Sequence, residues 1–163
     1  MAEGREAAAE DVYLRFGRGE QILALDLMFM GASWKSLYPF VFAEMLDGVG
    51  DRPIGMEAAQ LIRITRWTEQ KAGVSKVQLE VGGMRNQAVA LVAAALEPEL
   101  FSAIAVHDGI HSLSYVLDLP VTLRQGPEFF CLDLYKDFDI DRLEALAAPV
   151  KVRTSRYVEL SQK

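Results

Sequence analysis

The sequence predicts an α/β fold built as a three-layer sandwich, with a mostly parallel sheet between two layers of helices. Short apolar runs typical of buried strands alternate with segments whose apolar residues recur at helical spacing. Because the crossover to each parallel strand returns over a face of the sheet, this alternation favours helices on both faces. No internal repeat, low-complexity tract or linker divides the chain, so residues 1–163 are expected to form a single domain.

Four short, mostly apolar runs are the expected strands. They are bounded by glycine, proline or polar residues, as strands usually are. His107 and Asp108 follow the third strand, at the end where open parallel sheets place their ligands. The expected strands span Glu20–Phe29, Val74–Val81, Phe101–Val106 and Val150–Val152.

The helices show clearer signals. The longest, Ile54–Lys71, has an apolar stripe and follows Pro53, which suits a first helical turn; Gly73 closes it as a C-cap. A helix over Asn86–Leu96 is apolar all round, which predicts burial on more than one side. Shorter helical segments are expected at Phe40–Leu46, Ile110–Leu117, Glu128–Tyr135 and Asp139–Leu146.

The composition excludes several classes of partner and site. The net charge of −6 and the scattered Lys and Arg residues argue against nucleic acid, whose phosphates are bound by basic clusters. The single cysteine, Cys131, excludes an internal disulfide and a Cys-rich zinc site, and its apolar neighbours predict a buried structural thiol.

The N-terminal segment predicts the location of the protein. Residues 1–12 lack the basic start and apolar stretch of a signal peptide and are expected to form a frayed polar lead-in. The nearby apolar run Ile22–Met30 is interrupted by Asp26 and is too short to span a bilayer. We expect a soluble cytoplasmic protein with no membrane partner, an expectation that does not hold for a fragment of a longer precursor.

Residues 76–96, KVQLEVGGMRNQAVALVAAAL, have the layout of a nucleophile elbow: a strand, a glycine pair and a small-residue helix. The elbow pattern is Gly-x-Ser-x-Gly, and its serine stands on the sharp turn above the sheet. With the first glycine aligned on Gly82, Met84 stands in the serine's place and Asn86 replaces the second glycine.

Four segments together resemble the C-terminal half of α/β-hydrolases of the acetyl xylan esterase and dienelactone hydrolase-like kind. They are LALDLMFMG, VQLEVGGMRNQAVALVAAAL, FSAIAVHDG and DIDRLEALAAPVKV, in the family's order over residues 20–153. The resemblance implies a partial α/β-hydrolase fold, an ancestry among acyl or carbohydrate esterases and no cofactor. The early strands of that fold, with the loop that supplies one oxyanion-hole donor, would precede residue 20, and we expect this chain to lack them.

The chemistry that the resemblance implies is incomplete. The Met84 thioether has no proton to lose and is not a nucleophile. In the family, the acid and the histidine follow the strand after Pro149, where this sequence has Glu159 as its one acid and no histidine. We therefore expect a catalytically deficient protein, with the start of the helix, Gly83, Met84, Arg85 and Asn86, able to hold an anion or carbonyl of a substrate.

A different active site is the alternative. His107, Asp108 and His111 are the further catalytic candidates, since they lie beyond a strand end. A histidine pair four residues apart suits a metal on a helix, but Gly109 predicts a loop, and no metal is expected. The acidic, aromatic stretch 128–141 lacks the glycine and closing glutamate of a calcium loop and is expected to pack on the sheet.

Three hypotheses remain open from the sequence. The first is a degenerate α/β-hydrolase-like protein without chemistry of its own. The second is an active carboxylic-ester hydrolase that uses Cys131 or Ser112 as nucleophile, with His107 or His111 as base. The third is a non-catalytic binding or assembly module, in which a second copy or a partner chain covers an exposed sheet edge and an uncovered apolar face.

Overall fold

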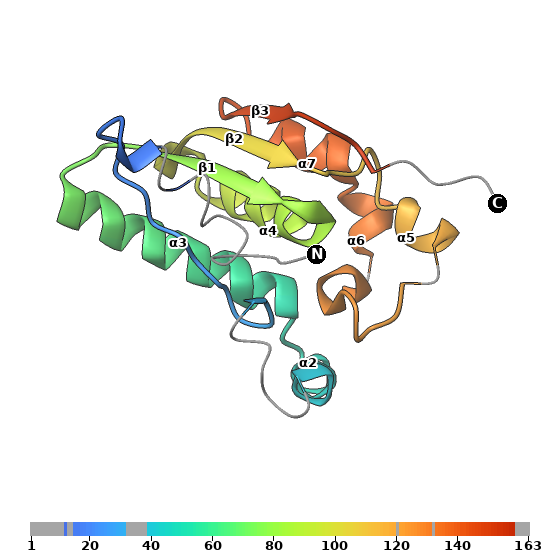
Figure 1. Ribbon diagram of the computed structural model, residues 1–163. Coiled ribbons are helices and arrows are strands. Elements are labelled where there is room, and N and C mark those ends of the chain that lie inside the picture. Colours follow the sequence, from blue (N-terminus) through green and yellow to red (C-terminus); the bar gives the residue numbers. More distant parts are fainter. Residues whose placement is uncertain (1–11, 13–14, 32–38, 120, 132, 159–163) are drawn as a thin grey trace.

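The computed structural model describes residues 12, 15–31, 39–119, 121–131 and 133–158. The chain forms a small α/β structure with a three-stranded sheet (Figure 1). Its elements, in chain order, are α2 (Pro39–Gly48), α3 (Pro53–Ala72), β1 (Val77–Gly82), α4 (Gly83–Leu96), η3 (Pro98–Leu100), β2 (Phe101–His107), α5 (Tyr115–Asp118), η4 (Pro127–Phe130), α6 (Leu134–Asp137), α7 (Ile140–Leu146) and β3 (Lys151–Thr154).

The sheet is entirely parallel and has the order β1-β2-β3, which confirms the predicted parallel α/β class. Leu79 stands opposite Ile104, which in turn stands opposite Val152. Beyond β3 the pairing continues as a single bridge between Gly109 and Tyr157. Within the described part of the chain, β1 and β3 are therefore the two outer strands of the sheet.

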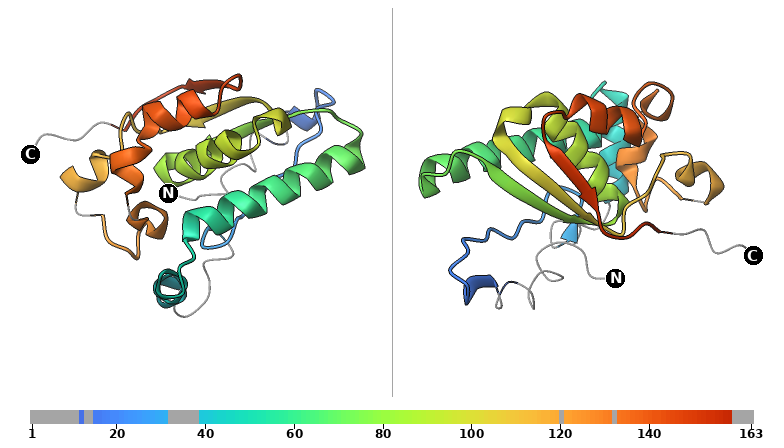
Figure 2. Two further views of the ribbon diagram at one scale, coloured as in Figure 1. Left: turned by 180° about the vertical axis from the view of Figure 1, so that it is seen from behind. Right: turned by 90° about the horizontal axis from the view of Figure 1, so that it is seen from above.

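The described helices α3, α4 and α7 lie on one side of the sheet (Figure 2). The expected second helical layer is not found among the described residues. The strand patterns give the physical reason: Leu79 is buried and Glu80 exposed, and β3 alternates in the same way, as strands with one covered face do. The open face of the sheet is largely polar rather than apolar, and carries Gln78, Glu80, Ala103, Ala105, His107, Lys151 and Arg153.

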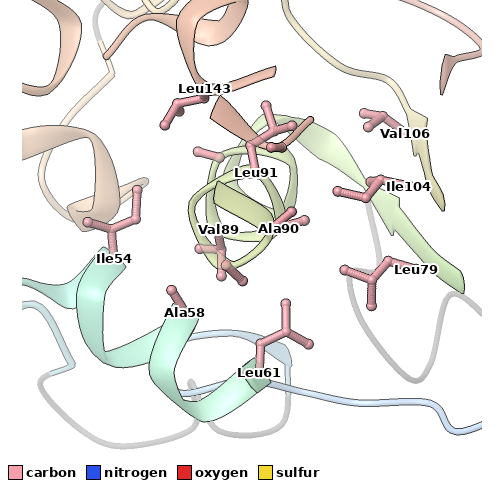
Figure 3. Packing of buried hydrophobic residues seen from close by; sticks show 14 of the residues in the cluster. Ile54, Ala58, Leu61, Leu79, Val89, Ala90, Leu91, Ile104, Val106 and Leu143 are labelled. Atoms are coloured by element: carbon pink, nitrogen blue, oxygen red, sulfur yellow. The ribbon is translucent and has the colours of Figure 1, made fainter. Parts of the chain in front are cut away.

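Helix α4 forms the centre of the core, between the sheet and α3 (Figure 3). Four of its alanines, Ala88, Ala90, Ala93 and Ala94, are buried and leave room for large side chains from both neighbours, such as Leu61 of α3 and Ile104 of β2. Leu143 of α7 closes the cluster beside Leu91. Burial of α4 on more than one side is thus confirmed, although the helix begins at Gly83, three residues before the predicted start.

The ends of α3 confirm the predicted signals. Pro53 occupies the first helical turn, and Gly73 adopts the left-handed conformation (φ 66°) that glycine takes without strain. Helix α7 is also capped at its start, because the Asp139 side chain accepts a hydrogen bond from the Ile140 amide.

The prediction of a strand over Glu20–Phe29 is wrong. Residues 20–27 have no regular secondary structure, and a turn follows over residues 28–30. The apolar side chains at its end are still buried, but their backbone bonds to side chains instead of to a strand. The Met28 amide donates to Gln60 at 2.8 Å, and the Phe29 carbonyl accepts from Arg85 at 2.8 Å.

Two expected helices are shorter than predicted. Of Ile110–Leu117, only the end is helical, in α5. The segment Glu128–Tyr135 divides into η4 and the start of α6, because Asp133 takes a positive φ of 61° that no continuous helix allows.

Residues 1–11 of the expected lead-in and Glu159 lie outside the described residues. Among the helices described, none is long and apolar enough to cross a membrane.

Candidate functional site

The chain turns sharply between β1 and α4, at the place where the sequence predicts an elbow. Gly82 is the last residue of the strand and Gly83 the first of the helix, with no loop between them. The reversal falls on Gly83, whose φ is +80°. In an elbow this strained position carries the nucleophile, and it lies one residue before Met84, which the sequence alignment put in the serine's place. Here it has no side chain, and Met84 is half-buried in the first helical turn against the core.

Arg85, predicted to hold a substrate, points into the protein. Its Nε lies 2.9 Å from Glu128 Oε2 and its Nη2 lies 2.6 Å from Glu128 Oε1, a two-pronged ion pair. Both residues are buried. Asn86 is also engaged locally, because its Nδ2 donates to the Gly82 carbonyl at 2.7 Å. The four predicted substrate-binding residues, Gly83 to Asn86, therefore lie at one turn. The guanidinium of Arg85 is already bound to the carboxylate of Glu128.

A second acid, Glu57 of α3, belongs to the same buried group. Its side chain is fully buried, and neither carboxyl oxygen has a hydrogen-bond donor. Burial and the negative charge of Glu128 raise the pKa of Glu57 far above its ordinary value. The sequence contained a signal for this group, since Glu57 falls between Ile54 and Leu61 on the apolar stripe of the helix.

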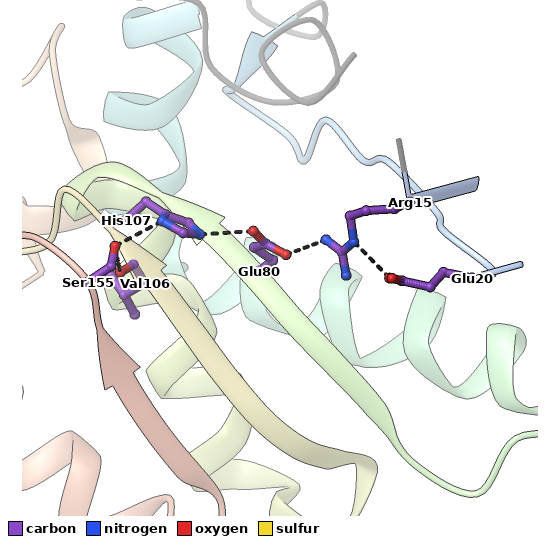
Figure 4. Close-up of polar contacts among 6 residues, drawn as sticks. All are labelled: Arg15, Glu20, Glu80, Val106, His107 and Ser155. Atoms are coloured by element: carbon purple, nitrogen blue, oxygen red, sulfur yellow. Dashed lines mark hydrogen bonds and ion pairs between the residues drawn. The ribbon is translucent and has the colours of Figure 1, made fainter. Parts of the chain in front are cut away.

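His107 connects two other side chains on the open face of the sheet (Figure 4). Its Nε2 lies 2.9 Å from Glu80 Oε1, and its Nδ1 lies 2.9 Å from Ser155 Oγ. The three residues come from β1, the end of β2 and the residue after β3, so parallel pairing places them side by side. Ser155 Oγ also lies 3.3 Å from the Val106 carbonyl, a second acceptor for the hydroxyl.

Glu80 is held by positive charge on its other side. It accepts a hydrogen bond from Arg15, whose Nε also donates to Glu20 at 2.8 Å. Partial burial acts to raise the pKa of the Glu80 carboxyl, but the hydrogen bonds from His107 and Arg15 outweigh it and lower the pKa below its ordinary value. The group is therefore an ionised carboxylate at neutral pH.

The series hydroxyl, imidazole and carboxylate contains the parts that nucleophilic catalysis by serine requires. When the Glu80 carboxylate accepts a hydrogen bond from His107 Nε2–H, the other ring nitrogen, Nδ1, carries no proton. Nδ1 can then take the proton of the Ser155 hydroxyl. The side chains are open to solvent, with His107 48% and Glu80 38% exposed. Of the three, only His107 was predicted. The signals for the others were a glutamate inside an apolar strand and a serine just beyond the last one.

The other predicted histidine and aspartate are not part of this group. Asp108, at a positive φ of 56°, pairs with Arg156, whose hydrogen bond lowers the pKa of the carboxyl. His111 stacks on Tyr157 with ring centroids 3.4 Å apart. Within the described residues, no group of three or more His, Cys, Asp and Glu side chains could hold a metal ion.

The two alternative nucleophiles lie in other surroundings. Ser112 Oγ donates to Asp139 Oδ2 at 2.6 Å, and the Leu113 amide donates to Oδ1 of the same carboxylate at 2.6 Å. Ser112 therefore joins a loop to the start of α7 instead of facing a histidine. Cys131 packs against the core but is half-buried, not buried as predicted.

Fold and geometry define a small parallel α/β protein with two polar groups near the carboxyl ends of its strands. Comparison with known proteins adds no relative: no family model, no curated protein and no solved structure matches the chain.

Proposed function

We propose that this chain is an α/β-hydrolase-like domain in which the turn between β1 and α4 no longer carries out acyl transfer. One observation carries the proposal: the turn residue with the positive φ is Gly83, and the side chain after it is the half-buried Met84. Neither offers a proton to a base or an electron pair strong enough to attack a carbonyl.

The buried ion pair behind the turn supports this proposal. Arg85 uses its guanidinium to bind Glu128 and the Phe29 carbonyl, so it stabilises the protein interior and is not available to an incoming anion. The turn then serves as a structural joint between the sheet and α4. The domain acts as a binding or assembly module, and a second copy of the chain is the proposed partner along the free edge of β1 or β3.

The test is hydrolysis of a short acyl ester such as p-nitrophenyl acetate, with the oligomeric state measured by light scattering on the same samples. The wild type, Met84→Ser and Gly83→Ser are compared; Met45→Ser on the exposed part of α2 controls for the reactivity of an added serine. We expect all four proteins to match the uncatalysed rate and to associate. Turnover that appears only in Met84→Ser would show an intact acid and base near the turn and overturn the proposal, while a wild type that stays monomeric would remove its assembly part.

Ester hydrolysis by Ser155 is a second candidate function, favoured by the two 2.9 Å contacts of His107. Ser155 Oγ would attack the ester carbonyl as its proton passes to His107 Nδ1, and Glu80 would stabilise the resulting imidazolium through Nε2–H. The alcohol would leave with that proton, and water would then release the acyl group from Ser155. Because the group is open to solvent, small activated esters are the substrates that fit it.

The same assay decides between the two functions. If Ser155 is the nucleophile, Ser155→Ala lowers wild-type turnover by on the order of 10³-fold, and His107→Gln does the same. Ser102→Ala, at an exposed serine of β2, is the matched control and leaves turnover unchanged. A fluorophosphonate adduct found on Ser155 by mass spectrometry would support this candidate. An inert wild type would eliminate it.

A further inference from the structure

The buried group formed by Glu57, Glu128 and Arg85 lies at the meeting point of three elements. Glu57 comes from α3, Arg85 from the first turn of α4, and Glu128 from η4. The two glutamate residues have no exposed surface and Arg85 is 9% exposed. Water therefore cannot solvate any charge that remains uncompensated there.

The balance of charge inside this group requires a proton. Arginine stays protonated at every pH at which a protein folds, so the group holds one fixed positive charge. With both carboxyls ionised it would carry a net negative charge in the protein interior, which is strongly disfavoured. One proton on the pair makes the group neutral.

The two carboxyl groups differ in their hydrogen-bond partners. Glu128 accepts two N–H groups from Arg85, so each of its oxygens has a donor without a proton of its own. Glu57 has no donor for either oxygen, and as a carboxylate it would have two unsatisfied acceptors in the core. As a carboxylic acid it becomes a donor, and the Glu128 carboxylate is the neighbouring acceptor.

We propose that Glu57 and Glu128 hold one proton between them in the folded protein, so that closing the junction of α3, α4 and η4 takes up a proton at neutral pH. The charged groups that act on Glu57 are Glu128 from η4 and Arg85 from α4. Since Arg85 directly follows the turn, loss of the proton would loosen the start of α4. This pH-sensitive junction stands independently of the proposed function.

The sign of the effect follows from proton linkage. In the unfolded chain Glu57 loses its proton near the ordinary value of 4.5, whereas in the folded protein it keeps the proton to a much higher pH. Between these limits the folded state binds one more proton than the unfolded state, so stability falls as pH rises. One proton corresponds to a tenfold rise in the unfolding equilibrium constant per pH unit.

The experiment compares urea unfolding of the full chain as wild type and Glu57→Gln from pH 6 to pH 8. Glutamine has the same shape as glutamic acid and no proton to lose. The unfolding equilibrium constant of the wild type should therefore rise about tenfold per pH unit relative to that of Glu57→Gln. At pH 8 we expect the variant to be the more stable protein. Glu44→Gln, at an exposed position on α2, is the control and should follow the wild type. Parallel pH profiles for wild type and Glu57→Gln would overturn the proposal.

A second measurement examines the native state directly. At pH 7 the infrared difference spectrum of wild type minus Glu57→Gln should contain the carbonyl band of a protonated carboxylic acid. A carboxylate band in its place would show that both acids are ionised and would overturn the proposal even if the variant were poorly folded.

Discussion

The buried group of Glu57, Glu128 and Arg85 and the exposed group of Glu80, His107 and Ser155 are built from similar side chains on opposite sides of one sheet. The buried group is closed to solvent, whereas the His107 and Glu80 side chains are 48% and 38% exposed. Burial makes each missing partner costly in the first group, and water replaces missing partners in the second. Similar polar side chains are therefore satisfied by one another in the buried group and remain open to water in the exposed group.

The largest difference between the two regions should come from removing the buried cation. Arg85→Ala leaves Glu128 and Glu57 inside the protein without a counter-charge, and we expect a loss of about 3–5 kcal/mol in the free energy of unfolding. Urea denaturation measures it. Arg153→Ala, on the open face, is the control and should change stability by less than about 0.5 kcal/mol. Equal effects of the two substitutions would show that the ion pair is not buried in solution.

Removal of a buried neutral side chain should lower the free energy of unfolding by an intermediate amount. Gln87 is fully buried, accepts from the Ile110 amide at 2.8 Å and donates to the Ile110 carbonyl at 3.1 Å. Gln87→Ala leaves both backbone groups unsatisfied and should cost about 1–3 kcal/mol. The change should also increase amide exchange at Ile110. Unchanged protection at that amide would mean that water enters the site and replaces the glutamine.

A substitution in the exposed group should lower the free energy of unfolding least. Glu80→Gln weakens the contacts with His107 and Arg15 and should cost about 0.2–1 kcal/mol at neutral pH. The folded protein lowers the pKa of Glu80, so its stabilisation is full above the ordinary value of 4.5 and disappears as pH falls below it. Wild type and Glu80→Gln should therefore converge in acid. Urea denaturation of both proteins at pH 7 and pH 3 tests this expectation. The same difference in the free energy of unfolding at both pH values would contradict it.

Local signals in the sequence predicted the two long helices, α3 and α4, better than the short ones. The apolar stripe, Pro53 and Gly73 together define α3, because stripe and caps are properties of the segment itself. The same reasoning identified the strand and helix on either side of Gly83. It placed the start of α4 too late, because an extended strand can pass into a helix through one glycine with a positive φ.

What the sequence did not predict depends on distant partners. Glu20–Phe29 reads as a strand by composition, but Gln60 and Arg85, far along the chain, bond to its backbone. Ser155 lies 48 residues from His107 and meets it only because β2 and β3 pair in parallel. The single covered face was predictable, since β1 and β3 alternate apolar and polar residues, a pattern that a sheet covered on both faces does not show.

Gly83 has a consequence for how this chain can change over evolution. A serine at position 83 would have to adopt the left-handed backbone that glycine takes freely, at a cost of about 1–3 kcal/mol. It would also need a base within reach, and the side chain two residues on, Arg85, is committed to the interior. Each substitution on the route toward elbow chemistry would therefore lower stability before it brought any activity.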